Sequence, residues 1–265
     1  MLEFVGVEYG WSPQAPLQHD LSLRLRPGSF ITVLGGNGCG KSSLFSVFSD
    51  RSMLLGGRIL IEGVDMTAMT PRQLFSRMAV VAQNVAAVYP YSVLEYVLTG
   101  WFPWLGMFRT PGPQQRRDAQ EVMERLGIAS WSEHPVTALS GGEFKLAQLA
   151  RAMTGGRRLL LLDEVDAALD FSNQVRLADL LRDFAASGGA VMLITHNPNL
   201  PLALKSEVLL LSKTLPWRLG PAGELVVPGT LEEYFGVRVG EIRDRQSGLR
   251  QVIPLSDPSL APSGK

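Results

Sequence analysis

Residues 35–42 read Gly-Gly-Asn-Gly-Cys-Gly-Lys-Ser, which fits the pattern G-x-x-x-x-G-K-[ST]. Glycines at this spacing let backbone N–H groups curl around phosphate oxygens, while the lysine reaches the terminal phosphates and the hydroxyl holds Mg²⁺. A β-branched run precedes the loop and a helical pattern follows it, so the positive end of a helix would also face the phosphates. A turn that binds nothing is therefore the less favoured interpretation. The predicted nucleotide contacts are Gly35, Gly36, Asn37, Gly38, Cys39, Gly40, Lys41, Ser42 and Ser43.

A second set of candidate residues follows four leucines, in the stretch Arg158–Glu164. The leucines indicate a fully buried strand, and Asp163 and Glu164 lie at its carboxyl end, where ligands bind in open α/β sheets. Asp163 is predicted to bind Mg²⁺, directly or through water, and Glu164 to polarise an attacking water. Two ordinary surface acids would give the same pattern, but the phosphate-binding loop favours ATP hydrolysis.

Leu139-Ser140-Gly141-Gly142-Glu143 is the third candidate segment. Taken alone, it is a capped helix start, because a small polar residue precedes an apolar run. Its position between the phosphate-binding loop and the acidic strand gives it a functional interpretation as well.

Strands and helices alternate along the chain in the order expected for a parallel sheet covered by helices. The segment from about 86 to 156 is mostly helical in pattern and is predicted to be an insert. Periodicity predicts strands at 2–9, 21–26, 29–34, 58–62, 79–82, 159–162, 190–195 and 207–211, and helices at 72–78, 114–126, 142–154, 171–186 and 198–205.

Composition excludes several classes. Lysine plus arginine equals aspartate plus glutamate, 25 each, so no global basic excess points to nucleic acid. Cys39 is the single cysteine, which fits a reducing compartment. The start of the chain lacks a signal-peptide pattern, and its aliphatic runs are far shorter than a membrane span. We therefore expect a cytoplasmic protein, soluble or docked on a membrane through another protein.

Together these motifs resemble, in order, those of the ATP-binding subunit of an ABC transporter, from about residue 2 to 237. The resemblance implies a RecA-like α/β core with an N-terminal antiparallel β portion and a helical subdomain, followed by a C-terminal tail at 238–265. It assigns adenine stacking to Tyr9, with Trp11 as a rival. It also implies a catalytic Lys41 and identifies Gln83 with the Q-loop, where the glutamine also contacts the metal. Asp170 matches the D-loop, and His196 matches the switch histidine.

The resemblance also implies partners. The family works as a dimer in which ATP lies between the phosphate-binding loop of one copy and the signature, Leu139–Glu143, of the other. Membrane-spanning permease subunits are separate chains, and the dimer docks on them at the cytoplasmic face of the membrane. An importer further implies an external substrate-binding protein.

A narrower resemblance concerns Gly100-Trp101-Phe102-Pro103-Trp104-Leu105-Gly106 and the segment Leu231–Val237. Both are similar to importers of iron-siderophores, haem and cobalamin. The sequence departs from the family at Val165-Asp166, at Phe144-Lys145 and at Trp101. None of these changes removes a phosphate or metal ligand, so they bear on rate and partner docking. The sequence does not identify the cargo, because this chain does not contact the cargo in the mechanism that the resemblance implies.

Other functions remain as alternatives. A soluble ABC ATPase of DNA repair or translation usually carries coiled coils or duplicated domains, and neither pattern is present. A kinase or GTPase with a phosphate-binding loop is disfavoured by the signature and by the absence of an Asn-Lys-x-Asp motif. A regulatory nucleotide-binding module with weak hydrolysis stays open because of Val165-Asp166.

Two side chains carry sharper expectations. Cys39 at a helix start and beside Lys41 should have a lowered pKa and react readily, unless its side chain points into the core. Asp166 should have a raised pKa if it shares a cleft with Glu164, and an ordinary one if it points to solvent.

Overall fold

The computed structural model describes residues 1–255 except 84, 86, 88, 106–108 and 246–247. Its centre is a six-stranded sheet in the order β10-β9-β3-β8-β7-β6, parallel except for β10. These strands are β3 (Phe30–Gly35), β6 (Met78–Val81), β7 (Leu159–Asp163), β8 (Ala190–Ile194), β9 (Glu207–Leu211) and β10 (Arg218–Pro221). Every residue of β7 and β8 is buried, which explains their uninterrupted apolar runs.

A second, four-stranded sheet is antiparallel in the order β2-β1-β4-β5. It comprises β1 (Leu2–Tyr9), β2 (Gln18–Leu25), β4 (Leu54–Ile61) and β5 (Val64–Asp65). Alternating residues of β2 are buried, as the sequence pattern predicts for a strand with one face on the core. The buried side chains of this sheet form one apolar cluster with α1 (Lys41–Ser46) and the lower face of the core sheet.

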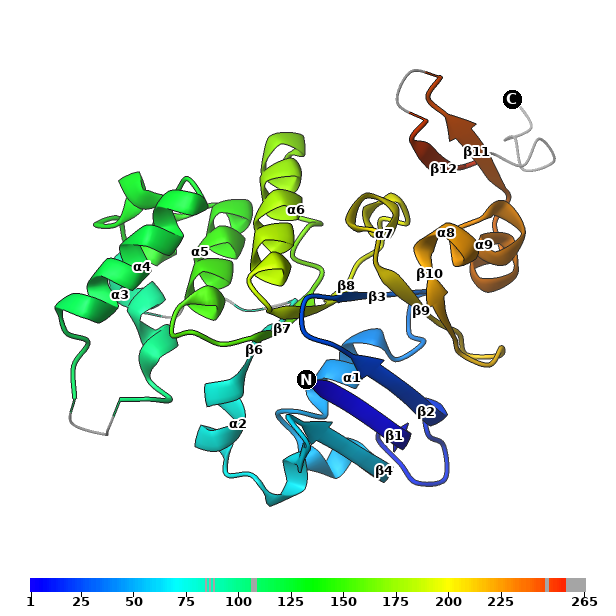
Figure 1. Cartoon of the computed structure of the whole chain (residues 1–265), viewed down its shortest axis with the longest axis horizontal. Coiled ribbons are helices and arrows are strands. Elements are labelled where there is room, and N and C mark those ends of the chain that lie inside the picture. The colour runs from blue at the N-terminus through cyan, green and yellow to red at the C-terminus, as the bar shows by residue number, and fades with distance from the viewer. Residues whose placement is uncertain (84, 86, 88, 106–108, 246–247, 256–265) are drawn as a thin grey trace, which may run out of the picture.

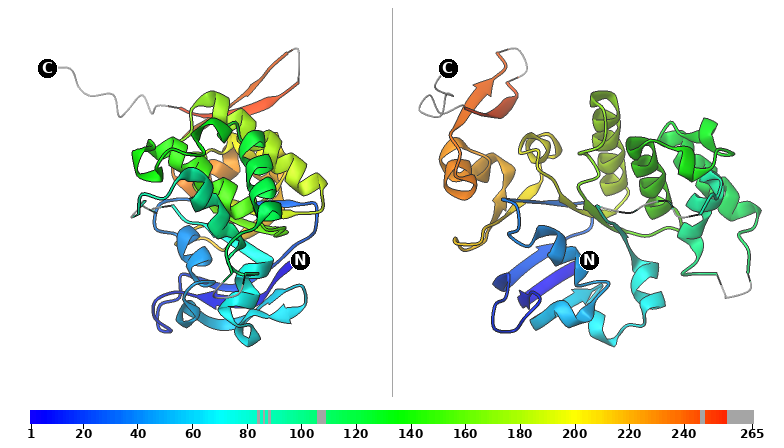
Figure 2. Two further views of the ribbon diagram at one scale, coloured as in Figure 1. Left: turned by 90° about the vertical axis from the view of Figure 1, so that its left-hand side faces the viewer. Right: turned by 180° about the vertical axis from the view of Figure 1, so that it is seen from behind.

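Helices cover the opposite face of the core sheet, where α5, α6 and α7 stand side by side (Figure 1). The helical subdomain contains α3, α4 and α5 and lies at one end of that sheet (Figures 1 and 2). The helices are α2 (Pro71–Arg77), α3 (Val93–Leu98), α4 (Pro113–Arg125), α5 (Gly141–Met153), α6 (Phe171–Ala186), α7 (Asn199–Leu204), α8 (Ala222–Leu225) and α9 (Pro228–Phe235). Among the described residues, no helix has the length and apolar character that crossing a bilayer requires.

The C-terminal part contains structure that the sequence patterns did not predict. A hairpin of β11 (Val239–Arg243) and β12 (Arg250–Pro254) follows α9. It extends away from the core sheet but touches α7, where the Asn199 side chain exchanges two hydrogen bonds of 3.0 and 2.8 Å with the backbone of Val252. Thus much of the segment expected to be a polar tail is a β-hairpin attached to the core, because Val252 is buried against it.

Candidate active site

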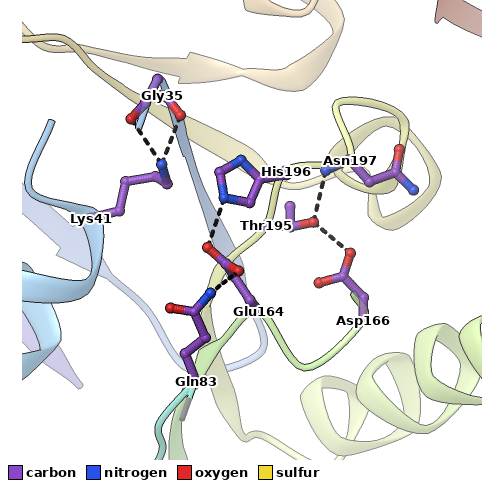
Figure 3. Close-up of polar contacts among 9 residues, drawn as sticks. Gly35, Lys41, Gln83, Glu164, Asp166, Thr195, His196 and Asn197 are labelled. Atoms are coloured by element: carbon purple, nitrogen blue, oxygen red, sulfur yellow. Dashed lines mark hydrogen bonds and ion pairs between the residues drawn. The ribbon is translucent and has the colours of Figure 1, made fainter. Parts of the chain in front are cut away.

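Four neighbouring parallel strands end at the same edge of the core sheet and bring the predicted polar residues together. The phosphate-binding loop follows β3, Gln83 follows β6, Glu164 follows β7 and His196 follows β8. The register pairs Val81 with Leu162 and Asp163 with Ile194, so these strands end level with one another. Figure 3 shows the resulting cluster, in which Gln83 and Glu164 are hydrogen-bonded although they lie 81 positions apart in the sequence.

The phosphate-binding loop curls around the ammonium group of Lys41. Lys41 Nζ donates to the carbonyl oxygens of Gly35 and Gly36 at 2.8 and 3.0 Å, and the side chain is buried. Gly40 has φ of +98°, a left-handed conformation that glycine adopts without strain. Asn37, Gly38 and Ser42 are exposed, while Gly36 and Ser43 are half-buried. The loop therefore presents backbone and hydroxyl groups to solvent at the sheet edge.

The expected reactivity of Cys39 is wrong. Its side chain is 3% exposed and belongs to the apolar cluster beneath the loop. Burial raises the pKa of the thiol, and this outweighs the opposing effects of Lys41 and Lys213. The sulfur therefore packs into the core, away from solvent.

Tyr9 is also placed differently from the expectation. The ring is fully buried, and its hydroxyl donates to the carbonyl oxygen of Gly40 at 3.1 Å. Burial raises the pKa of the phenol, since no solvent is left to stabilise the phenolate. A side chain with no exposed surface cannot stack on adenine in this conformation, so Tyr9 supports the loop instead. Trp11, two residues on, is 74% exposed and is the aromatic residue available to a base.

Glu164 lies at the centre of the cluster (Figure 3). Gln83 donates through Nε2 to one carboxylate oxygen, and His196 Nε2 lies 2.7 Å from the other. The backbone of Glu164 is left-handed, with φ of +50°, which is uncommon for a residue with a side chain and is typical of functional sites. Only 11% of the side chain is exposed, so a carboxylate is held between an amide and an imidazole with limited access to water.

Asp163 and Ser42 form a site suited to a hard cation. Asp163 is 4% exposed, and its Oδ1 has no hydrogen-bond partner among the described residues. Burial is the largest effect and raises the pKa of this carboxyl, while the hydroxyl of Ser42 beside it acts in the opposite direction. A buried carboxylate oxygen without a partner is costly unless a cation or proton neutralises it. Its surroundings therefore fit Mg²⁺, which binds oxygen ligands.

Asp166 points neither into the Glu164 cleft nor to solvent. It is 5% exposed, and its Oδ2 accepts a hydrogen bond of 2.6 Å from Thr195. Its pKa is raised, as expected for a shared cleft, but burial is the largest cause and repulsion by Glu164 a smaller one. Thr195 also accepts from the backbone N–H of Asn197 at 3.0 Å, so Asp166 braces the loop that carries His196.

The predicted signature and D-loop are exposed helix starts. Ser140 caps α5, and Ser140 and Glu143 exchange backbone–side-chain hydrogen bonds of 2.8 and 3.4 Å. These bonds hold the pKa of Glu143 below its usual range. Leu139 and Gly142 are half-buried, and Gly141 is exposed. Asp170 caps α6 by accepting from the backbone N–H of Asn173, which lowers the pKa of Asp170. Among the described residues, no hydrogen bond joins either segment to the phosphate-binding loop of the same chain.

Sequence reasoning missed the buried contacts of Lys145, noting the residue only as a departure from the family. The residue is 8% exposed, and its Nζ donates to the carbonyl oxygens of Ala82 and Gln83 at 2.7 and 2.8 Å. The signal that could have found it was a charged residue in the middle of an apolar helix face, because such a residue must have buried partners.

Comparisons with known proteins agree with this geometry. A family model described as ABC transporter matches residues 18–167, and one described as AAA domain, AbiEii toxin, Type IV TA system matches 135–203. The hemin import ATP-binding protein of Agrobacterium fabrum is 31% identical over 250 residues, covering 91% of this chain and 93% of its own. The iron(3+)-hydroxamate import ATP-binding protein of Bacillus subtilis is 28% identical, covering 91% and 89%.

Solved structures give the same result. A chain from an inward-facing metal-chelate type ABC transporter superposes with a TM-score of 0.82 at 26% identity, covering 98% of this chain and 99% of its own. A dimeric bacterial ABC transporter cassette superposes with a TM-score of 0.72 at 20% identity, covering 84% and 99%, which shows a shared fold. The chain therefore belongs to the ABC transporter family, as an ATP-binding subunit with ATPase activity.

Proposed function

We propose that this chain is the motor subunit of an importer for iron-siderophore, haem or cobalamin, and that Glu164 is its catalytic base. The observation that carries the catalytic assignment is the carboxylate of Glu164 held between Gln83 and His196 at the edge of the core sheet. A carboxylate fixed by two neighbours can accept a hydrogen bond from a water molecule and orient it toward a phosphoryl group.

ATP would enter the phosphate-binding loop and take over the contacts of Lys41. Its ammonium now donates to two loop carbonyls, and phosphate oxygens are stronger acceptors because they are charged. The exposed indole of Trp11 offers a stacking surface for adenine in place of the buried Tyr9.

The oxygen atoms of Ser42, Gln83 and Asp163 would hold Mg²⁺. The metal would neutralise charge on the phosphate oxygens, while Asp163 supplies the anionic ligand. The partnerless Oδ1 of Asp163 supports this assignment, because the atom is buried and lacks a donor among the described residues.

A second copy of the chain would complete each site. Ser140 and Gly141 are exposed, and we propose that they contact the γ-phosphate bound to the partner, with Asp170 near the same interface. Contacts that exist only while the γ-phosphate is present would close the dimer with ATP and release it after hydrolysis.

Permease subunits would dock on the segment between Gln83 and the helical subdomain. Val85, Tyr89, Tyr91 and Phe102 are each 45–66% exposed, so large apolar side chains are available to a partner here. The names of similar proteins support an importer, since they include ATP-binding proteins for hemin, iron(3+)-hydroxamate and cobalamin import. The subunit would then lie at the cytoplasmic face of the membrane, with an external substrate-binding protein delivering cargo and no nucleic acid involved.

The test combines an ATPase assay of the purified chain with capture of its membrane partners. The purified chain should hydrolyse MgATP, and a tagged form in its native membrane should retain separate membrane-spanning chains. Uptake of labelled haem, cobalamin and ferric siderophore is then measured with and without this chain, and uptake of one of these cargoes should require it. Hydrolysis without any membrane partner would contradict the transport assignment and favour a regulatory ATPase.

A further inference from the structure

Lys145 is a buried cation that neither the phosphate-binding loop nor the metal ligands require. It lies on α5, five residues after the capping Ser140, between the buried Phe144 and Leu146. Its ammonium donates to the carbonyl oxygens of Ala82 and Gln83 at 2.7 and 2.8 Å. Two short charge-assisted hydrogen bonds from a buried side chain fix the backbone they reach.

The two carbonyl oxygens belong to a stretch of backbone that the core sheet does not hold. Ala82 and Gln83 directly follow β6, which is an edge strand of the core sheet among the described residues. The sheet therefore provides no further strand to hold this backbone as it leaves the edge. Lys145 supplies the missing donors from a helix that packs against β6.

The charges around Lys145 belong to the catalytic cluster. Burial is the largest effect and lowers the pKa of Lys145, while the carboxylates of Asp163 and Glu164 act in the opposite direction. The ammonium therefore holds the backbone that follows β6 while it feels the charges of the acidic strand end. Its side chain connects α5 with the backbone of Gln83, one of the two residues that hold Glu164.

We propose that Lys145 is a positioning residue that holds Gln83 against Glu164 and links the signature end of α5 to the hydrolytic site of the same chain. This inference rests on the proposed roles of Gln83 and Ser140. Five residues of helix rise about 7.5 Å, so Ser140 and Lys145 belong to one rigid element. When the partner's nucleotide shifts the exposed end of α5, Lys145 shifts with it and moves the Gln83 backbone.

The experiment compares Lys145→Gln and Lys145→Arg with Arg151→Gln in the full-length chain. Arg151 is on the same helix but lies over the ring of Tyr96, 5.2 Å from its centre. We expect Lys145→Gln to lower kcat about tenfold and to change the Kd for MgATP less than twofold. Lys145→Arg should recover at least half of the turnover, and Arg151→Gln should match the wild type.

A double variant shows whether Lys145 acts through Gln83. Gln83→Ala should lower kcat by itself. Adding Lys145→Gln should then cause little further loss of kcat, because both changes disrupt the same contact between Gln83 and Glu164. If Gln83→Ala retains full turnover, the proposed catalytic role of Gln83 fails. If Gln83→Ala is slow but Lys145→Gln is normal, or if the two losses multiply, only the positioning inference is overturned.

A folding control keeps the result decisive. If Lys145→Gln lowers the melting temperature so far that ATP binding is lost, Lys145→Met repeats the measurement, since it keeps the buried stem and removes only the ammonium. A folded Lys145→Met protein with wild-type kcat overturns the proposal, and a folded protein with lowered kcat and unchanged Kd supports it.

Discussion

The strand-end cluster and the C-terminal hairpin are attached to the same core sheet in different ways. Glu164 is bound by side chains that follow two other strands, so its position depends on the register of β6, β7 and β8. The β11–β12 hairpin instead rests on helices α7 to α9, through the buried Val252 with its two hydrogen bonds to Asn199 and through single hydrogen bonds of Val239 and Arg250. A group fixed by several strands has little freedom, whereas a hairpin that rests on helices can change without moving the sheet edge.

The largest expected effect is at the centre of the cluster. Glu164→Gln keeps the shape of the side chain but loses the carboxylate, so turnover should fall about 100-fold or more. The Kd for MgATP should change less than twofold, and the variant should accumulate as an ATP-bound dimer. Steady-state ATPase assays and size-exclusion chromatography with ATP measure both effects, with the surface variant Glu3→Gln as the control. Equal turnover in wild type and variant would remove Glu164 from catalysis.

Lys41→Ala should mainly affect binding. A charge-assisted contact to phosphate contributes about 1.5–3 kcal/mol, so the Kd for MgATP should rise about 10- to 100-fold. Isothermal titration calorimetry measures this change, and Arg24→Ala on the exposed side of β2 is the matched control for loss of one basic side chain. An unchanged Kd would contradict the phosphate-binding assignment.

Substitutions in the hairpin should change stability and leave turnover unchanged, unlike those in the strand-end cluster. Val252→Ala removes a buried side chain and should lower the free energy of unfolding by about 1–3 kcal/mol. Ile242→Ala on the other strand, where the side chain is 52% exposed, should have little effect. Both variants should keep wild-type turnover. A tenfold loss of turnover in folded Val252→Ala would show that the hairpin contributes to the site.

The smallest effect concerns pH. The raised pKa of Asp166 means that the folded protein favours the protonated acid, so unfolding releases a proton between the ordinary and the raised pKa. The stability contributed by the protonated carboxyl is therefore lost as pH rises through that window. Asp166→Asn removes this dependence, and urea unfolding across the acidic range should show wild-type stability falling relative to the variant. Parallel curves would mean that Asp166 has the same pKa in the folded and the unfolded protein, which contradicts the raised pKa.

Much of the site could be predicted from sequence because its residues belong to short patterns with local causes. Glycine spacing at 35–40 reflects a backbone requirement, and the run before Asp163 reflects complete burial of β7. Strand and helix positions also agreed closely, and α6 and β9 have the predicted bounds. Residues 212–254 were not predicted because β10, α8, α9 and the hairpin are short, and short elements lack a clear period.

The sequence by itself determined which residue types follow which strands, and therefore which groups meet at the edge of a parallel sheet. Only the tertiary structure decided where individual side chains point. Tyr9 and Cys39 were expected at the nucleotide, yet both pack into the core beneath the loop. Lys145 lies in an apolar helix, yet it reaches the catalytic cluster. Sequence spacing gives the face of an element, but the elements packed against that face determine whether a side chain meets solvent, apolar atoms or a backbone carbonyl.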